Sequence, residues 1–412
     1  METDVIVVGA GPAGCLAAYI LATQGINVTL FEKTPFPRYK VCGGGLTHKI
    51  LQEIPFDISP VIETTIHSFR FSHQYANIFT RHSDEPLMYC TMRANLDALV
   101  LQKAIEAGAT VRMGEQVTSF LQDNSGITVQ TKEKSFRAHV LIGAEGATGL
   151  VSRLAGLRNS VEIELAWEAE VAADSADLKR FSDTVFLDWG TMPGGYAWVF
   201  PKKDHFSIGV GGPARLSKQM MQYYDRFVKS ISRDSANPSD TRIRFLETHS
   251  FAPWPIPVST KQSLFHNGRV LVAGDAAGLG DPLTCEGIYY AIKSGRIAAE
   301  ICEKYLSGKI SSMDVYSKII NVELMTELNV ASKIKQLLDA FPLKVHCFVG
   351  SSDRAWRAFG KILRGERQYE DVRRGFGKWK FLWNLICFIC GILGNIRKNR
   401  FVKNHRAERS IN

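Results

Sequence analysis

Apolar and glycine-rich stretches alternate at the N-terminus in an order that predicts a strand, a turn, a helix and a second strand. Residues 4–8 form a short run rich in β-branched side chains, and Gly9-Ala-Gly-Pro-Ala-Gly14 follows it. A helical pattern then runs from Cys15 to Gly25, and a second strand spans Asn27 to Phe31 and leads into Glu32. This order is typical of the opening βαβ unit of a dinucleotide-binding domain.

The glycine motif has a physical reason to bind a dinucleotide. Glycine permits a tight turn, lets the backbone approach a pyrophosphate, and allows close contact between helix and strand. The N-terminus of the helix favours the anionic phosphates, and an acid about 20 residues later can bind ribose hydroxyls. We therefore predict dinucleotide contacts at Gly9, Gly11, Pro12, Ala13, Gly14 and Glu32. The alternative is a plain structural turn.

The remaining pattern predicts two kinds of sheet joined by helices. Residues 161–251 alternate as a half-buried antiparallel sheet does, with one helix near 214–233. Further strands are expected at 65–71, 76–80, 109–112, 116–120, 126–130, 136–143 and 270–273, and helices after Met92, ending at Gly108, and over 284–306.

These segments predict an α/β chain in which a β-rich domain is inserted into a discontinuous cofactor domain. The cofactor domain is expected to contain residues 1–60, 90–155 and 256–310, and the β-rich substrate domain residues 61–89 and 156–255. Residues 311–412 are expected to form a C-terminal helical region. A single core stops growing at roughly 250–300 residues, so a chain of 412 residues is expected to divide in this way.

The composition is that of a folded protein. Hydrophobic residues make up 45% and charged residues 22% of the chain, which excludes global disorder and collagen-like repeats. Eight cysteines are scattered along the sequence, and no basic segment precedes the first apolar run. We therefore expect reduced thiols in a cytosolic setting, no disulfide framework and no signal peptide.

Positive charge is concentrated at the C-terminus. Residues 353–412 contain 15 Lys and Arg against 5 Asp and Glu, whereas the rest of the chain contains 35 against 36. A partner that prefers positive charge is therefore expected at the tail. The body carries no nucleic-acid recognition motif, so we expect no nucleic-acid role.

Three motifs in this order resemble FAD-dependent proteins of the p-hydroxybenzoate hydroxylase type. They are the N-terminal glycine motif, Gly143-Ala-Glu-Gly146, and Gly274-Asp-Ala-Ala-Gly278 followed by Asp281-Pro282 and Glu286-Gly287-Ile288. The resemblance implies FAD as the cofactor. It also implies a Rossmann-like FAD-binding domain with an inserted antiparallel β-sheet substrate domain and a C-terminal helical segment.

The same resemblance assigns residues to the flavin. It implies that Gly274 and Asp275 belong to the cofactor site, with Asp275 on the ribityl chain, and that Pro282, Gly287 and Ile288 line the isoalloxazine ring. An acid that follows a buried strand also suits ligand hydroxyls on physical grounds. The alternative for Asp275 is the cap of a helix.

One acidic position departs from the superfamily pattern, and one basic position agrees with it. The middle motif usually has Asp where this chain has Glu145, one methylene longer, so the role of Glu145 stays open. Arg93 stands where the superfamily has an arginine close to the FAD phosphates, and the alternative is an exposed arginine at a helix start. The predicted cofactor-binding set is completed by Lys33, Arg38, Cys42, Gly43 and Gly44.

Two further segments resemble the geranylgeranyl reductase family, whose members saturate isoprenoid chains of lipids or quinones. They are Pro37-Arg-Tyr-Lys-Val-Cys42-Gly-Gly-Gly-Leu46 and Gly195-Tyr-Ala-Trp-Val-Phe-Pro201. The likeness spans roughly residues 1–365, and Gly365-Glu-Arg-Gln-Tyr369 resembles a C-terminal element of that family. It implies an FAD-dependent oxidoreductase that reduces C=C bonds of a polyprenyl (geranylgeranyl) chain.

Saturation of an isolated alkene by a flavin requires proton donation to the alkene and hydride transfer from flavin N5. We predict Cys42 as the acid, because a thiol is mostly protonated at neutral pH and the glycines after it allow close approach to the ring. Its alternative is a small packing residue. Tyr196 and Trp198 share one face of a strand, where aromatic rings can stabilise a cation. With Phe200 they are predicted to line the substrate cavity, and plain core packing is the alternative.

Two other functions stay open. One is an FAD-dependent monooxygenase of a lipophilic or aromatic substrate, and the other is a flavoprotein that only carries electrons at a membrane. The Trp-x-Trp-x-Ile-Pro element of flavin halogenases does not occur in the sequence. No second glycine motif follows a strand, so we expect the electron donor to be NADPH, docking transiently, or a ferredoxin-like carrier.

The tail is predicted to lie on a membrane surface. Residues 381–394 are apolar except Asn384 and have basic flanks. Fourteen residues of helix reach about 21 Å, short of the ~30 Å hydrocarbon core, so spanning is not expected. We expect residues 381–412 to attach the protein peripherally to the cytoplasmic membrane face, and the alternative is a core helix with a solvated tail. Cys387 and Cys390 lack a second ligand pair, so we predict burial and no metal site.

Overall fold

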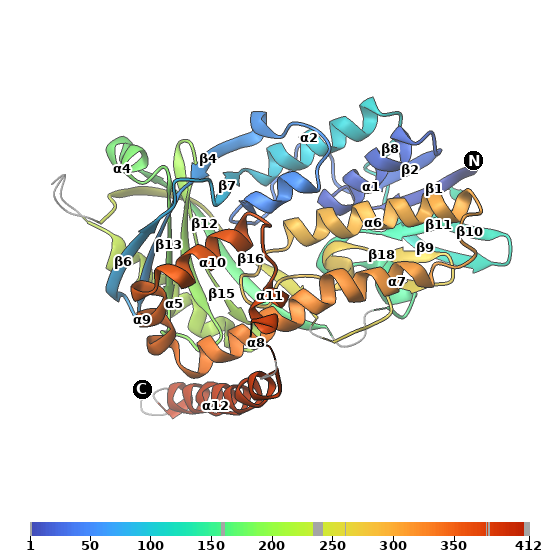
Figure 1. Ribbon diagram of the computed structural model, residues 1–412. Helices are drawn as coiled ribbons and strands as arrows, with labels where there is room; N and C mark the ends of the chain where they lie inside the picture. Colours follow the sequence, from blue (N-terminus) through green and yellow to red (C-terminus); the bar gives the residue numbers. More distant parts are fainter. Residues whose placement is uncertain are drawn as a thin grey trace.

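The computed structural model describes residues 2–157, 161–233, 242–259, 261–375, 377 and 380–407. In this part of the chain, the strands form an eight-stranded, a seven-stranded and a three-stranded sheet. Figure 1 shows the two large sheets at opposite ends of an elongated body, with the C-terminal helices along one side. Residues 408–412, the end of the predicted membrane segment, lie outside the described residues.

The eight-stranded sheet contains the predicted N-terminal βαβ unit. Five neighbouring strands run parallel, and α1 (Pro12–Thr23) makes the crossover between the first two strands of the chain. The sheet contains β1 (Glu2–Val8), β2 (Val28–Glu32), β8 (Thr110–Met113), β9 (Val117–Asp123), β10 (Gly126–Thr131), β11 (Ser135–Gly143), β17 (His266–Asn267) and β18 (Val270–Val272). Every residue of β2 is buried, as expected for a parallel strand that is covered on both faces.

Helices α2 (Arg93–Glu106) and α6 (Ile288–Leu306) pack on either side of α1. Gly295 allows α6 to approach α1 closely, because a Cβ atom there would lie 2.3 Å from the Ala13 carbonyl oxygen. Helix α6 begins four residues later than the predicted start at residue 284. A loop precedes the helix, and in this loop Cys285 has a left-handed φ of 56°, which a right-handed helix cannot contain.

The seven-stranded sheet has the order β16-β12-β15-β14-β13-β5-β6. Its strands are β5 (Ser68–His73), β6 (Ala76–His82), β12 (Glu162–Ala173), β13 (Thr184–Trp189), β14 (Tyr196–Pro201), β15 (His205–Pro213) and β16 (Phe245–Val258). The neighbours are antiparallel except β13 and β5, which are parallel. These two strands come from distant parts of the chain and are not joined by a hairpin, so the local alternation could not reveal their direction.

Helix α5 (Ser217–Ile231) packs against this sheet and follows the short turn η4 (Ala214–Leu216), in agreement with the helix predicted near 214–233. A second, short helix, α4 (Ser175–Arg180), was not predicted. It begins where the Asp174 carboxylate accepts the backbone N–H of Ala176, a local cap that periodicity does not report.

A three-stranded sheet lies along the chain between β2 and α2. It contains β3 (Gly45–Thr47), β4 (Ile62–Ile66) and β7 (Met88–Thr91), with β7 in the centre. The short helical turns η1 (His48–Gln52) and η2 (Ser59–Val61) connect β3 to β4, and η3 (Gly146–Thr148) and α3 (Leu150–Leu154) follow β11. This sheet holds the segment after the predicted acid, Cys42, against the body.

The C-terminal region is helical, as predicted. It contains α7 (Asp314–Ile320), the π-helix η6 (Asn321–Met325), α8 (Thr326–Ala340), α9 (Pro342–Ser351), α10 (Asp353–Leu363) and α11 (Tyr369–Arg374). Pro342 stands at the first turn of α9, where its missing N–H costs nothing, and Ser352 caps α10 through the backbone N–H of Ala355. These helices lie beside both large sheets (Figure 1).

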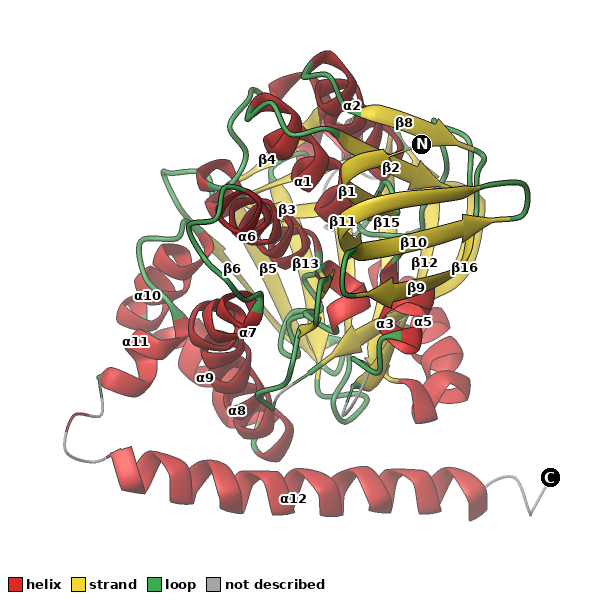
Figure 2. Cartoon of the chain, turned by 90° about the vertical axis from the view of Figure 1, so that its right-hand side faces the viewer, coloured by secondary structure: helices red, strands yellow, loops and turns green. Residues whose placement is uncertain are grey.

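The predicted apolar tail forms one helix, α12 (Lys380–Ala407), which lies along the outside of the body (Figure 2). Trp383, Cys387 and Cys390 are buried, and the helix packs on α8. The predicted burial of the two cysteines is confirmed. In the described part of the chain, the structure contains no helix that is both long and apolar enough to cross a membrane.

Candidate active site

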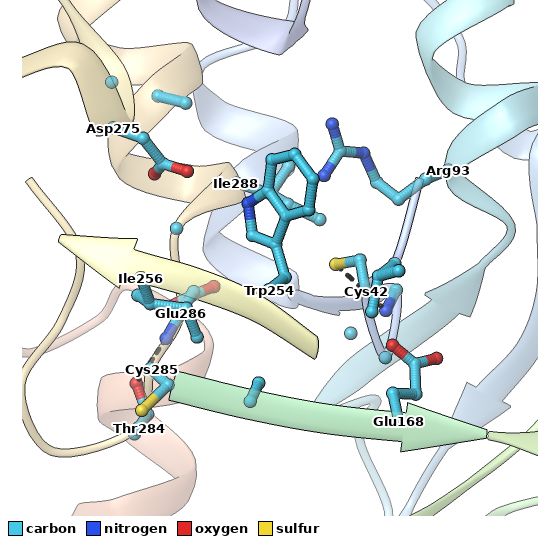
Figure 3. Close-up of a pocket in the computed structure, with 18 of the residues that line it drawn as sticks. Cys42, Arg93, Glu168, Trp254, Ile256, Asp275, Thr284, Cys285, Glu286 and Ile288 are labelled. Atoms are coloured by element: carbon cyan, nitrogen blue, oxygen red, sulfur yellow. Dashed lines mark hydrogen bonds between the residues drawn. The ribbon is translucent and has the colours of Figure 1, made fainter. Parts of the chain in front are cut away.

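A cavity of about 810 Å³ lies where the two large sheets meet. Its wall comes from the carboxyl ends of β1, β2 and β11, the inner face of the seven-stranded sheet, and helices α8, α9, α10 and α12. The carboxyl ends of parallel strands are where open α/β sheets bind ligands. Figure 3 shows how side chains from both sheets converge on this space.

The turn before α1 leaves room for an anion. Gly9 has a φ of 101°, and a Cβ atom there would lie 2.4 Å from the Ala144 carbonyl oxygen. A Cβ atom at Gly14 would lie 2.0 Å from the Gly9 carbonyl oxygen, so this glycine permits the turn to pack on the helix. A Cβ atom at Gly11 would meet no described atom within 4 Å, and no side chain caps α1. The helix N-terminus is therefore open to a phosphate group.

Glu32 stabilises this turn from the end of β2. Its Oε2 accepts the backbone N–H of Ala10 at 2.8 Å, and its Oε1 accepts that of Thr34 at 2.9 Å. The guanidinium of Arg38 lies 4.0 Å from Glu32 and 3.5 Å from Asp97. Each Glu32 oxygen keeps a second lone pair, which suits it to accept from a ribose hydroxyl.

Asp275 presents a carboxylate to the cavity from the turn η5 (Gly274–Ala277), which follows β18. Burial raises its pKa, and the charges of Lys40 and Arg93 act in the opposite direction. No hydrogen bond joins this carboxylate to another described residue, and the buried indole N–H of Trp254 likewise lacks a partner among them. Figure 3 shows both groups at the cavity. Unpartnered buried polar groups are rare in folded proteins, so the Trp254 N–H calls for a polar ligand, and the half-buried Asp275 carboxylate can accept hydrogen bonds from one.

The donor set fits FAD. The open N-terminus of α1 suits the pyrophosphate, Glu32 the ribose hydroxyls and Asp275 the ribityl hydroxyls. Most of the predicted cofactor residues line this one cavity: Gly9, Gly11, Pro12, Ala13, Glu32, Lys33, Arg38, Cys42, Gly43, Gly44, Arg93, Gly274, Asp275, Gly287 and Ile288. Gly14 and Pro282 do not line it. Gly14 lies behind the turn, and Pro282 is buried in the preceding loop.

Arg93 lies in the cavity wall and is not an exposed arginine at a helix start. Its Nε and Nη2 donate to the two carboxylate oxygens of Asp97 at 2.8 and 2.9 Å. Burial alone would lower the pKa of Arg93, but Asp97 and Cys42 raise it above its ordinary value. The guanidinium is therefore a fixed positive charge near Cys42.

Cys42 faces the cavity from a loop in which the following glycines leave no space for side chains. The Cys42 sulfur accepts the Gly44 N–H at 3.4 Å, and Gly44 has a φ of 64°. A Cβ atom at Gly44 would lie 1.9 Å from the Thr91 carbonyl oxygen, and one at Gly43 would lie 2.9 Å from the Phe200 ring. The Lys202 amine donates to the carbonyl oxygens of Gly43 and Thr91, both at 2.7 Å. These contacts hold the thiol beside β14.

Three aromatic side chains of β14 form a row along the cavity wall. The ring centroids of Tyr196 and Trp198 lie 5.7 Å apart, and those of Trp198 and Phe200 lie 6.2 Å apart. Gly209 on the neighbouring strand makes space for the indole, because a Cβ atom there would lie 2.1 Å from Trp198 Cζ2. The Tyr196 hydroxyl donates to the Thr284 carbonyl, which ties the row to the loop before α6.

Glu168 is a wall residue that the sequence analysis missed. It lies on β12, is 2% exposed, and its Oε1 accepts the Ser207 hydroxyl at 2.6 Å. Burial raises its pKa to about 7, while the Ser207 hydrogen bond and the charge of Lys202 act in the opposite direction. Figure 3 shows its carboxyl group on the same side of the cavity as Cys42. The only signal in the sequence is an acid within an apolar strand, which ordinary alternation assigns to a solvent-facing side.

Two other features of the wall were also missed. Cys285 lines the cavity in a left-handed conformation, and burial raises its pKa to about 12. Trp254 on β16 lies under the Lys40 amine, 3.5 Å from the ring centroid. Neither residue belongs to a motif, so only the packing of distant strands could reveal them.

Glu145 also lines the cavity, and one of its carboxylate oxygens holds a neighbouring helix in place. Its Oε1 accepts the backbone N–H of Val151 at 2.6 Å and so stabilises the start of α3. Burial raises its pKa, and its Oε2 is buried without a partner among the described residues. The longer side chain thus reaches α3 and still leaves one oxygen unpaired.

Sequence comparison finds related proteins over most of the chain. A family model described as FAD binding domain matches residues 2–318. A digeranylgeranylglycerophospholipid reductase of Methanocella arvoryzae is 30% identical over 353 residues, which is 82% of this chain and 87% of the relative. A protein of the same description from Methanosarcina acetivorans is 27% identical over 419 residues, covering 96% of this chain and 98% of the relative.

Solved structures share the fold. A geranylgeranyl bacteriochlorophyll reductase-like protein from Thermoplasma acidophilum superposes with a TM-score of 0.72 at 24% identity, covering 92% of this chain and 99% of that one. A flavin-dependent brominase superposes with a TM-score of 0.67 at 18% identity, covering 99% of this chain and all of the other. At these identities the likeness concerns the fold, which supports both reductive and oxidative flavin chemistry.

Proposed function

The chain belongs to the FAD-dependent geranylgeranyl reductase family, and on that premise we propose that it saturates C=C bonds in the polyprenyl chain of a lipid or quinone. The observation that carries this proposal is the juxtaposition of a thiol, a buried carboxyl group and an aromatic row in one apolar cavity beside the FAD site. FAD, once bound and reduced, supplies the hydride for such a reduction. The other requirements fall on the side chains of the protein.

The first requirement is a proton donor at the alkene. Cys42 faces the cavity from the glycine loop, and Arg93 lies beside it in the same wall. Glu168 offers a second protonated group across the loop, since its pKa of about 7 keeps much of it neutral at physiological pH. We propose Cys42 as the donor and Glu168 as the group that restores its proton.

The second requirement is a wall that tolerates a positive charge on carbon and excludes water. Tyr196, Trp198 and Phe200 present π-faces to the cavity, and each can stabilise a cation by roughly 0.5–2 kcal/mol. They offer the cation no strong nucleophile, whereas water would capture it. The polyprenyl chain would therefore lie along this row.

The protein would meet its substrate at a membrane surface through α12. The outer side of this helix exposes Leu385, Ile386, Phe388, Ile389, Ile392, Leu393 and Ile396. No acidic residue occurs between 380 and 402, whereas Arg397, Lys398 and Arg400 follow the apolar stretch. An apolar stripe with basic residues suits an interface of anionic lipid. Electrons would come from NADPH, docking transiently, or from a ferredoxin-like carrier.

The test is mass spectrometry of a geranylgeranyl lipid after anaerobic incubation with the purified FAD-loaded protein and a chemical flavin reductant. We expect a gain of two hydrogens for each double bond reduced. An unchanged lipid, together with one added oxygen atom when air and NADPH are supplied, would instead identify a monooxygenase. Flavin reduction with no change to the lipid under either condition would identify an electron carrier.

A further inference from the structure

Helix α12 contributes a positive charge to the cavity wall. Arg397 is the one residue of its described part that lines the cavity, and it contacts Gly190 of the β13–β14 loop and Asp339 of α8, which line the cavity too. The basic residues that follow it, Lys398 and Arg400, do not line the cavity. The arginine therefore has a position that a general attraction to anionic lipid would not require.

Arg397 has no carboxylate partner among the described residues. Its Nη1 donates to the Asp339 backbone carbonyl at 3.2 Å, and its Nη2 donates to the Gly190 carbonyl at 3.1 Å. The Asp339 carboxylate is paired with Lys398 at 2.8 Å. Burial lowers the pKa of Arg397, and Asp339 acts in the opposite direction. A half-buried guanidinium with only neutral acceptors retains an unbalanced charge.

The neighbouring charged groups do not balance it. Lys335 also lines this part of the cavity, but its amine is paired with the Glu164 carboxylate at 2.7 Å. Lys335, Arg397 and Lys398 together face Glu164 and Asp339, so three cations meet two carboxylates. The excess of one positive charge is sited at Arg397, and it favours an anionic ligand.

Apolar side chains from the other C-terminal helices line the same cavity. Leu338, Pro342, Val349, Phe359 and Leu363 from α8, α9 and α10 line the same cavity as the aromatic row of β14. A cavity whose wall contains one unbalanced cation together with apolar and aromatic side chains is complementary to an amphiphile with an anionic head and an apolar chain.

We propose that Arg397 binds the anionic phosphate head group of the polyprenyl lipid, with the isoprenoid chain extending along the cavity toward Tyr196, Trp198 and Phe200. This rests on the proposed function, because it names the substrate class for the same cavity. It makes Arg397 a specificity-determining residue: the charge selects a phosphorylated lipid over a neutral polyprenol or quinone. The helix that contacts the bilayer and the residue that receives the head group are then one element.

The competing explanation is structural, since the two hydrogen bonds of Arg397 join α12 to α8 and to the β13–β14 loop. The test must therefore compare substrates that differ only in charge. We would measure kcat and KM of the FAD-loaded full chain, in neutral detergent micelles, with digeranylgeranylglyceryl phosphate and with digeranylgeranylglycerol. The variants are Arg397→Gln and, as a control, Arg357→Gln, at an exposed arginine of α10 that does not line the cavity.

For Arg397→Gln we expect the KM for the phosphorylated lipid to rise tenfold or more, roughly the loss of one charge-assisted hydrogen bond, with kcat little changed. The neutral lipid should be reduced as before, and Arg357→Gln should resemble the unmodified protein with both lipids. An equal loss on both substrates would overturn the head-group site in favour of the structural explanation. Unchanged kinetics on both would overturn it as well.

A binding measurement keeps this proposal separate from the proposed reaction. The saturated lipid diphytanylglyceryl phosphate has no double bond to reduce, so calorimetric titration reports affinity whether or not the protein is a reductase. We expect Arg397→Gln to bind this lipid more weakly than the unmodified protein does, and Arg397→Lys to bind it with an affinity between the two. Affinity of the unmodified protein should fall with added salt. Salt-independent binding, or equal affinity of all variants, would overturn the proposal even if lipid reduction were established.

Discussion

Individual residues of the cavity wall determine which chemistry it can support. Cys42 and Glu168 lie on the same side of the cavity, although they come from different domains of the predicted division. The surroundings of Glu168 determine its pKa. Burial raises the pKa, and Glu170 acts in the same direction. The Ser207 hydrogen bond and the charges of Lys202 and Lys40 lower it, but burial has the larger effect. A carboxyl group of this kind is suited to exchange protons near neutral pH.

The first prediction concerns the thiol. Cys42→Ala should retain the FAD absorbance spectrum and lose most alkene reduction, about 10²-fold or more, because a positioned acid contributes on that order. Cys347→Ala, at an exposed cysteine, is the control and should keep full activity. Reduction at the unmodified rate by Cys42→Ala would eliminate the thiol as the acid.

The second prediction concerns pH and stability. The pKa of Glu168 is raised from 4.5 to about 7 in the folded chain. Its protonation therefore stabilises the fold fully below pH 4.5, and this contribution is lost as the pH rises through 7. Glu168→Gln removes the charge and keeps an acceptor for Ser207. The variant should gain stability relative to the unmodified protein between pH 5 and pH 8, by up to roughly 3 kcal/mol.

This comparison is made by chemical denaturation of both proteins at the two pH values. A difference that does not change between pH 5 and pH 8 would show that the carboxyl group titrates at the same pKa in both states. The pH profile of lipid reduction is a separate readout. Activity of the unmodified protein should fall above pH 7, where Glu168 loses its proton. Glu168→Gln has no proton to lose there, so its activity should not show this pH dependence.

Short elements, and not long helices, position the reacting groups. The glycine loop 42–45 passes so close to β7 and β14 that neither Gly43 nor Gly44 could carry a side chain without displacing a neighbour. The aromatic row of β14 in turn needs the small Gly209 on β15. These contacts explain why the loop is rich in glycine and why β14, which lies against it, faces a glycine of β15.

The third prediction tests this loop. Gly44→Ala should destabilise the protein by about 2 kcal/mol or more, because its left-handed backbone disfavours a side chain and a Cβ atom would overlap the Thr91 carbonyl oxygen. Gly25→Ala is the matched control: Gly25 also has a positive φ, 75°, but its Cβ would meet no described atom within 4 Å. Thermal unfolding measures both. Equal losses would mean that backbone strain, and not the close contact, accounts for the effect.

The fourth prediction belongs to α12. Phe388→Glu with Ile392→Glu should reduce binding to vesicles that contain anionic lipid at least tenfold, because both side chains are exposed on the apolar stripe. Leu121→Glu, at an exposed leucine of β9, is the control and should bind as the unmodified protein does. Sedimentation with vesicles measures the bound fraction. Unchanged binding of the double variant would remove α12 from the membrane contact.

At the scale of the whole molecule, the cavity exists only because several distant segments meet. The FAD site comes from the eight-stranded sheet, the aromatic row and Glu168 from the seven-stranded sheet, and the apolar end with Arg397 from the C-terminal helices. The seam between two sheets can enclose a cofactor and a chain-like substrate together, which neither sheet could do alone. Helix α12, which we propose to face the membrane, packs on α8, one of these C-terminal helices (Figure 2).

Local patterns in the amino-acid sequence were enough to predict the βαβ unit with its glycine turn, the acid Glu32, the strand that leads to Asp275, the alternation of Tyr196 and Trp198, and the apolar tail. These follow from periodicity and from backbone conformations that only glycine adopts readily, and both act over a few residues. The tertiary structure alone decided the parallel pairing of β13 with β5, the burial of Glu168, the cavity positions of Trp254 and Cys285, and the approach of Arg397 to the substrate cavity. Burial and unbalanced charge depend on neighbours contributed by distant segments, so no local pattern in the chain carries them.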